Sequence, residues 1–414
     1  MSHTSNKFAK VEPVINKPPM VAKVLATGKS AEIASYYGFE LINPPRLEKV
    51  DMDNARKFLG ITYSKKDEPL IKKPLLIHPE DKVAVLRMYH EQEMFTWSQP
   101  VMLYYEGLVQ HEGSRKAKWP GVKTFHLDVL GTTKSIAEAT LIKGVVETLR
   151  EEGFGELMVH VNSIGDKDSM NRFCRELANH YRKHISVLSN HCRQVMKTDI
   201  FKVYECDDEK CRPVHESAPN PINFLSELSR QHFREVLEYL ESLGIAYKIH
   251  NGLICDRNMW TQTAFEIREV ETNTLLATGM RYNGISKKLG YRKEIGAVGV
   301  TVSYKKPKEE ALFNRNRPGK APKVYFVQLG FEAKLKSLEV IEMLRKANIP
   351  LAQSIGKDKI SGQIQSAENS KIPHTIIMGQ KEARDNSVIV REMSTRHQET
   401  ISLAKLPEYL KKIR

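Results

Sequence analysis

Hydrophobic and polar residues follow two periodicities along this chain of 414 residues. Apolar positions at helical spacing predict helices over residues 20–37, 80–92 and 136–151. A further amphipathic helix has an apolar stripe made of Phe224, Leu228, Phe233, Val236, Leu237 and Leu240. Short β-like runs predict strands at 39–42, 74–78, 102–109, 124–130, 158–162, 253–254, 264–267, 275–278 and 297–304. This mixture indicates an α/β (α+β) fold.

The same patterns divide the chain into parts. Residues 1–19 are polar and rich in proline, which indicates a flexible N-terminal arm. Residues 20–304 form the predicted core, with an insertion at about 165–250. Residues 305–323 combine lysines and arginines with prolines and have no apolar period, as in a basic linker. In residues 324–414 strands and helices alternate again, which predicts a small C-terminal α/β domain.

Composition narrows the classes of partner. Lysine and arginine number 64 against 50 acidic residues, so the net charge is +14 and a polyanionic partner is favoured. No apolar run reaches the roughly 18 residues of a membrane helix, and the start MSHTSNKFAK lacks the apolar stretch of a secretory signal. Five cysteines in so long a chain fit reduced thiols. We therefore expect a cytoplasmic protein with no membrane contact.

Four segments, in order along the chain, resemble the class II aminoacyl-tRNA synthetases of the histidyl type. They are Tyr37-Gly38-Phe39-Glu40-Leu41-Ile42-Asn43-Pro44-Pro45, Val161-Asn162-Ser163-Ile164-Gly165, the Gly279, Arg281, Tyr282 and Gly284 set, and the tail at 323–379. The resemblance implies a class II core, in which an antiparallel sheet is flanked by helices, and a C-terminal anticodon-binding-like domain. It also implies a homodimer, built through the first segment, and tRNA as the partner.

Three positions at which the family carries arginines for amino-acid activation are altered here. Gln110 takes the place of an arginine that stabilises the α-phosphate, although Glu112 of the same motif persists. Cys255 replaces a second arginine and Lys306 a third. Neither glutamine nor cysteine carries the cationic guanidinium that such chemistry uses. ATP and Mg²⁺ are therefore expected as cofactors only if the chain is active, with Arg257, His111 and Lys306 as substitutes.

The amino-acid pocket implied by the resemblance is also changed. Its positions here are Glu80, Thr124, Asp128, Trp260 and Tyr282. Glu80 and Tyr282 keep the family's residue types, whereas the other three differ from the family's glutamine, glutamate and tyrosine. In addition, Lys82 stands where the family has a threonine. We expect a pocket with a different fit for histidine.

Two further groups of residues suggest binding. Arg115, Lys116 and Lys118 form a basic loop beside Trp119, in a segment that approaches the acceptor end of tRNA in the family. Cys206 and Cys211, with Cys192 upstream, have a spacing that hints at a metal. A tetrahedral zinc site needs four ligands, however, and Ser226 and Ser229 stand where some family members carry cysteines. We therefore expect plain thiols and no metal.

Taken together, these residues predict a histidyl-tRNA synthetase-like protein whose aminoacylation is impaired or lost and which is retained for binding tRNA or another RNA, and for regulation. One alternative is an active histidine–tRNA ligase. A second alternative is a regulatory subunit of a partner enzyme, against which the C-terminal domain argues.

Overall fold

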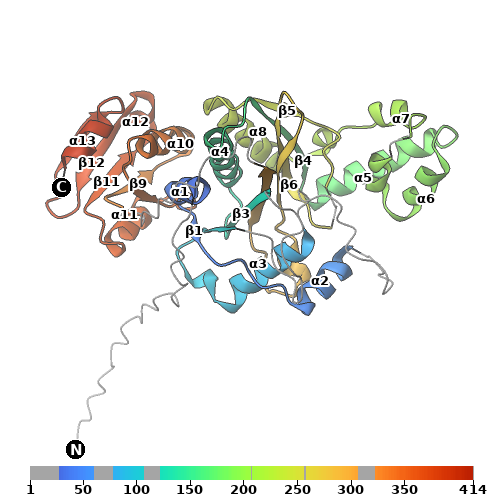
Figure 1. Cartoon of the computed structure of the whole chain (residues 1–414), viewed down its shortest axis with the longest axis horizontal. Helices are drawn as coiled ribbons and strands as arrows, with labels where there is room; N and C mark the ends of the chain where they lie inside the picture. The colour runs from blue at the N-terminus through green and yellow to red at the C-terminus, as the bar shows by residue number, and fades with distance from the viewer. Residues whose placement is uncertain are drawn as a thin grey trace, which may run out of the picture.

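The computed structural model describes residues 28–59, 78–106, 122–206, 208–255, 258–305 and 322–413. Its centre is an eight-stranded sheet (Figure 1). In spatial order the strands are β1 (Glu40–Leu41), β2 (Val101–Glu106), β3 (Val122–Leu130), β8 (Ala297–Lys305), β7 (Leu275–Arg281), β6 (Thr261–Glu269), β4 (Leu157–Gly165) and β5 (Tyr247–Ile249). Neighbours from β2 to β4 are antiparallel, and β1 and β5 are parallel to the strands beside them. This is the antiparallel sheet expected for the core.

Helices cover both faces of the sheet, and the alternation of β3 shows how. Phe125, Leu127 and Val129 join the apolar cluster of α1 (Lys29–Tyr36), α4 (Ile136–Glu151) and α8 (Glu227–Ser242). Because successive strand residues point to opposite faces, His126 and Asp128 face the other layer. There α2 (Lys49–Leu59) and α3 (Pro79–Glu91) pack, together with the short η1 (Met94–Thr96) and α9 (Ile285–Lys288). The candidate pocket residues therefore lie beneath α3.

One end of the molecule is a group of helices that projects from the sheet (Figure 1). It consists of α5 (Lys167–Lys183), α6 (Asn190–Thr198), η2 (Ile200–Glu205), α7 (Arg212–Glu216) and η3 (Pro221–Phe224). Side chains define where two of these helices begin. Asp166 accepts a hydrogen bond from the Ser169 backbone N–H, and Ser189 accepts one from the Cys192 backbone N–H. Such caps satisfy N–H groups that have no partner within a helix.

The C-terminal domain lies at the other end and has its own five-stranded sheet (Figure 1). The strand order is β10 (Leu351–Gln353), β9 (Val324–Gln328), β11 (His374–Met378), β12 (Ser387–Glu392) and β13 (Gln398–Ser402). Its helices are α10 (Phe331–Lys346), α11 (Ile360–Asn369), α12 (Gln380–Arg384) and α13 (Leu406–Lys412). Polar contacts join this domain to the core: Tyr37 donates to Glu342 at 3.1 Å, and Arg345 pairs with Glu151 at 2.5 Å.

Most of the helices predicted in the core are confirmed, with shifts at their ends. The predicted 80–92 and 136–151 helices are α3 and α4, and the 20–37 helix is described only from Lys29 onward. The prediction for Leu228 was wrong, since 79% of its surface is exposed. The buried face of α8 contains Ser229, Phe233, Val236, Tyr239 and Leu240. Leu228 is one residue away from this face and is therefore rotated by about 100°.

The strands show two differences. Residues 74–77 of one predicted strand lie outside the described residues, and His78 directly precedes α3. Residues 253–254 are not a strand, and β5 at Tyr247–Ile249 takes that place at the edge of the sheet. In the C-terminal part β13 and α13 were not predicted. None of the helices in the described ranges is both long and apolar enough to cross a membrane.

Candidate functional site

The carboxylate of Asp128 is the centre of the candidate pocket. It lies on β3, facing α3, and is fully buried. Tyr282, just after β7, donates to Oδ1 at 2.7 Å, and Tyr105 of β2 donates to Oδ2 at 3.1 Å. Burial, followed by the charge of Asp128, raises the pKa of both phenols well above its usual value, so both keep their protons for these bonds.

The third partner of Asp128 is a lysine of the chain itself. Nζ of Lys82, on the first turns of α3, donates to Oδ1 at 2.7 Å. Its side chain is 1% exposed, and Nζ lies 5.5 Å from the ring centroid of Tyr282. This is a buried ion pair between two layers of the fold, with a cation–π contact beside it. A carboxylate with three such donors has little remaining capacity to accept an imidazole N–H.

A second group of charges lies next to this pair, at the start of α3. Glu80 is buried and its carboxylate lies 3.6 Å from Nδ1 of His78. Burial is the first cause that raises the pKa of the neighbouring Asp81 to about 7, and the carboxylates of Glu80 and Asp128 add to it. The cations His78 and Lys82 act in the opposite direction. The carboxylates of Glu80 and Asp128 are therefore both within electrostatic reach of Asp81.

The other predicted pocket residues do not share contacts with Asp128. Thr124 lies on the same face of β3 but donates to Ser303 of β8 at 3.2 Å. Trp260 is 1% exposed and belongs to the apolar cluster of this face, and its buried Nε1 has no hydrogen-bond partner among the described residues. Cys255 is partly buried and packs against that cluster. The structure thus brings together Asp128, Tyr282 and Lys82, with Glu80 beside them.

Several predicted residues lie outside the described residues, so their placement remains a prediction. They are Gln110, Glu112 and Lys306 of the ATP motifs, Arg115, Lys116 and Lys118 of the basic loop, and His111 and Arg257 as substitutes. Of the three positions at which the family carries an arginine, only Cys255 lies in the described part of the chain. A thiol offers no cation to a phosphate.

Arg281 belongs to the same motif as Tyr282, and its contacts hold elements of the fold together. Its guanidinium is fully buried and forms two hydrogen bonds to Glu138 of α4, at 2.7 and 2.5 Å. It also donates to the backbone carbonyl oxygen of Thr132 at 2.9 Å. His232 of α8 contacts the same carboxylate at 2.8 Å. This arginine connects β7 with α4 and, through the shared carboxylate of Glu138, with α8.

Two residues of the pocket were missed from the sequence. Tyr105 sits in a run of apolar strand residues and gave no signal of its own. Lys82 was recognised as a replacement for a threonine but not as a partner of Asp128, because 46 residues separate them. The signal that could have identified the pair is chemical: Lys82 directly precedes the apolar run Val83–Leu86 and Asp128 lies among apolar residues of a strand, and a charge that is buried in this way requires a partner.

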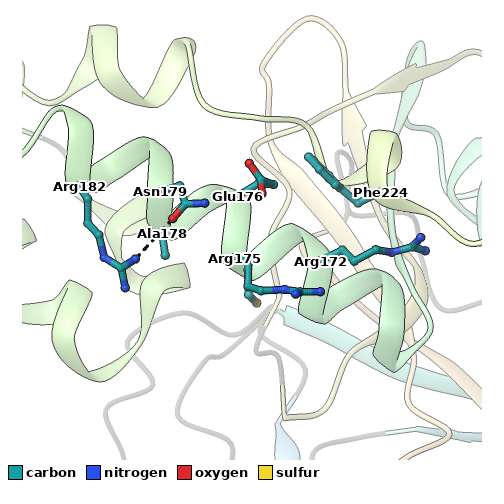
Figure 2. Close-up of a pocket in the computed structure, with 8 residues that line it drawn as sticks. Arg172, Arg175, Glu176, Ala178, Asn179, Arg182 and Phe224 are labelled. Atoms are coloured by element: carbon teal, nitrogen blue, oxygen red, sulfur yellow. Dashed lines mark hydrogen bonds between the residues drawn. The ribbon is translucent and has the colours of Figure 1, made fainter.

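An open hollow of about 800 Å³ lies along α5 (Figure 2). Arg172, Arg175 and Arg182 line it, with Glu176 between them in sequence and the ring of Phe224 at one side. Phe224 lies toward the Arg172 end of α5 in Figure 2, whereas Arg182 lies at the other end and donates to Asn179 at 3.4 Å. Guanidinium groups spaced along one helix form a surface suited to phosphate groups. The hollow shares no residue with the Asp128 pocket.

Comparisons with known proteins show what the chain as a whole resembles. The model of the anticodon binding domain matches residues 323–413. Histidine–tRNA ligase of Macrococcus caseolyticus is 27% identical over 398 residues, covering 92% of this chain and 94% of the relative. The same enzyme of Staphylococcus aureus is 26% identical over 400 residues. The crystal structure of apo S. aureus histidyl-tRNA synthetase superposes with a TM-score of 0.50 at 24% identity, over 92% of this chain and 93% of that one.

Proposed function

Because this chain belongs to the class II histidyl-tRNA synthetase family, we propose that it is an RNA-binding member that no longer attaches histidine to tRNA. The observation that carries the proposal is the bond between Lys82 and Asp128. In the family the residue at the position of Asp128 receives the imidazole of the substrate. Here the ammonium group of Lys82 already binds the carboxylate of Asp128.

The energetics of the pair explain why histidine does not displace it. Both side chains are almost completely removed from water, so breaking the bond leaves an uncompensated charge in the interior. Such a loss costs about 3–5 kcal/mol. Histidine would have to compensate for that cost and also find room beside Lys82. With Gln110 and Cys255 in place of arginines, a bound ATP would also lack cations for its developing charge.

Two features support RNA as the retained partner. The C-terminal domain, which matches the anticodon-binding model, supplies a module that binds tRNA in the family. The net charge of +14 and the arginines along α5 supply cations for a phosphate backbone. The RNA is proposed to be tRNA or a structured RNA that resembles it.

The proposal also includes a homodimer. In the family the segment that contains β1 builds the subunit interface, and here β1 is a two-residue strand at the edge of the large sheet. Light scattering on the purified chain tests this point. The expected mass is twice that of one chain, and a single-chain mass would remove the dimer from the proposal.

The decisive experiment measures histidine-dependent pyrophosphate exchange and RNA binding on the same preparation. We expect no exchange above background, together with binding of tRNA that weakens at least about tenfold between 50 and 200 mM salt. Exchange at an ordinary rate would overturn the loss of activity and favour the active ligase. Absence of both exchange and RNA binding would favour the regulatory-subunit alternative.

A variant of Lys82 tests whether this lysine closes the pocket, that is, whether it keeps histidine away from Asp128. Lys82→Thr restores the family's residue and leaves Asp128 without its cation, so we expect a lower melting temperature that millimolar histidine partly restores. Lys143→Thr is the matched control, because Lys143 is a similarly buried lysine paired with Glu147 at 2.7 Å on α4. That variant should also melt earlier but gain nothing from histidine. Equal responses of both variants would show that Lys82 does not close the pocket.

A further inference from the structure

Three thiols and one imidazole converge in the projecting group of helices. Cys192 lies in the first turn of α6, Cys206 follows η2, Cys211 precedes α7, and His215 lies on α7. One ligand atom from each residue lies within 4.8 Å of every other. Cys192 and Cys211 are buried, and the other two are partly buried. These side chains come from three short segments, because Cys211 and His215 belong to the start and body of α7.

The distance between two of the sulfur atoms matches the edge of a metal tetrahedron. A zinc–sulfur bond of about 2.3 Å in tetrahedral geometry places neighbouring ligand atoms about 3.8 Å apart. Sγ of Cys211 and Sγ of Cys192 lie 3.6 Å apart. That separation is much longer than a disulfide bond of about 2.05 Å, and all five cysteines are free. The thiols are thus positioned around a common point without being bonded to each other.

Hydrogen bonds from outside the group orient its members, as is usual around metal ligands. The hydroxyl of Tyr181 on α5 lies 3.1 Å from Nδ1 of His215. With Nδ1 held there, the ring nitrogen that would coordinate a metal is Nε2. The Ser189 backbone N–H donates to Sγ of Cys211 at 3.3 Å, and the Ser189 hydroxyl lies 3.8 Å from Sγ of Cys206.

We propose that Cys192, Cys206, Cys211 and His215 bind one structural Zn²⁺ ion. Thiolate and imidazole are the ligands that zinc prefers in such sites, and four protein ligands complete its coordination. No position remains for water or substrate, so the ion has no catalytic role. It cross-links α6, η2 and α7 and, through Tyr181, fixes them to α5. The inference does not depend on whether the chain aminoacylates.

This inference replaces the expectation of plain thiols, which rested on an assumed position for the missing ligands. Ser226 and Ser229 lie elsewhere: the Ser226 hydroxyl donates to Asp166 at 2.6 Å and contacts Ser229 at 3.0 Å. The fourth ligand is instead His215, four residues after Cys211. Residues at that spacing on a helix share one face.

A metal also accounts for how this segment holds its shape. Residues 190–216 contain three short helical pieces, and their buried apolar side chains, apart from the cysteines, are Ile200, Phe201, Val203 and Val214. Segments with so small a core of their own commonly need a cross-link to fold stably. Binding of zinc supplies that cross-link at the point where all three pieces meet.

The test is the metal content of the full chain, purified without a metal-binding tag and dialysed extensively. We expect about one zinc per chain by mass spectrometry, and a tetrahedral cobalt–thiolate visible spectrum when Co²⁺ replaces it. Cys211→Ser and His215→Ala should lower the zinc content at least tenfold. Cys174→Ser is the control, because this α5 cysteine is outside the group, and it should keep its zinc.

A second measurement uses the wild-type chain and therefore tests the proposal even if the variants fail to fold. Removal of zinc from the wild-type chain by a chelator should lower its melting temperature, and added Zn²⁺ should restore it, whereas Mg²⁺ should not. The proposal is overturned if wild-type protein made with zinc present contains less than a tenth of an ion per chain and reduced, metal-free protein gives no cobalt spectrum. Full zinc retention by both ligand variants would equally overturn it.

Discussion

A Cβ atom built on Gly299 would lie 1.9 Å from Oδ1 of Asp128. The two residues are direct partners across β3 and β8, and the same Cβ would lie 2.8 Å from Nζ of Lys82. Both distances are shorter than the contacts that real Cβ atoms make. The backbone of β8 therefore forms the floor of the closed pocket, and only glycine leaves room for the buried ion pair.

Gly299→Ala should accordingly destabilise the protein. The added methyl group displaces Asp128 or Lys82 from the bond they share, and overpacking of this kind costs about 1–3 kcal/mol. Urea denaturation measures the change in the free energy of unfolding. The control is Gly362→Ala in α11, where a Cβ would meet open space and the variant should match the wild type or gain up to about 1 kcal/mol. A Gly299→Ala protein as stable as the wild type would contradict the packing described.

The coupling between Lys82 and Asp128 can be measured by a double-mutant cycle. Lys82→Met and Asp128→Asn preserve the approximate volume of each side chain, and each leaves its partner buried and unpaired, at a cost of about 3–5 kcal/mol. The double variant leaves no charge unpaired and should lose much less than the sum of the two. Denaturant unfolding of all four proteins gives the coupling energy. Additivity within about 0.5 kcal/mol would show that the two residues do not depend on each other.

The sequence predicted much of the fold because the fold depends on local patterns. The alternation of β3 placed Asp128 and Phe125 on opposite faces, and the helical periodicity identified α3 and α4. The order of the motifs indicated the class II architecture. Leu228 was misplaced because an apolar residue at the edge of a helical stripe looks the same in sequence whether it is covered or exposed.

The site could be predicted only in part, because its partners are distant in the chain. Asp128 and Tyr282 were found through resemblance, and Lys82 was found as a substitution. Their mutual contact follows from the packing of α3 on the sheet, which no spacing along the chain encodes. His215 was missed for a related reason: the turn between η2 and α7 brings it to Cys192, 23 residues earlier in the sequence.

Asp81 should make the stability of the protein depend on pH. Burial, partly offset by His78, raises the pKa of its carboxyl from 3.8 to about 7 in the folded state. A raised pKa means that the folded state favours the proton, so this stabilisation is complete below pH 3.8 and is lost as the pH rises through 7. Between pH 5 and pH 8 the wild type should lose about 2–3 kcal/mol that Asp81→Asn retains.

Guanidinium denaturation of both proteins at pH 5, 6.5 and 8 tests this difference. Asp53→Asn is a suitable control, because the side chain of Asp53 on α2 is 54% exposed. The free energy of unfolding of this variant should change with pH in the same way as that of the wild type. If Asp81→Asn also runs parallel to the wild type, then Asp81 ionises as easily in the folded chain as in the unfolded one.

Glu138 should give the opposite dependence on pH. Burial alone would raise the pKa of this carboxyl, but the charges of Arg281 and His232 and their hydrogen bonds outweigh burial and lower it from 4.5 to about 2. A lowered pKa means that the stabilisation is present above pH 4.5 and is lost as the pH falls toward 2. Glu138→Gln keeps the shape of the side chain but leaves Arg281 buried without a counter-charge, so it should cost about 3–5 kcal/mol at pH 7.

The same substitution should make the free energy of unfolding less dependent on pH in the acid range. Between pH 5 and pH 3 the wild type loses the contribution of Glu138, about 1–2 kcal/mol, while Glu138→Gln has no such contribution to lose. Urea denaturation of both proteins at pH 7, 5, 4 and 3 measures the free energy of unfolding. The difference between the two proteins isolates the contribution of Glu138, because the other carboxylates titrate in both. Glu227→Gln, with its side chain 82% exposed, should follow the wild type throughout. An identical acid slope in the wild type and Glu138→Gln would mean that Arg281 does not stabilise the carboxylate. The contact between β7 and α4 would then depend on packing rather than on charge.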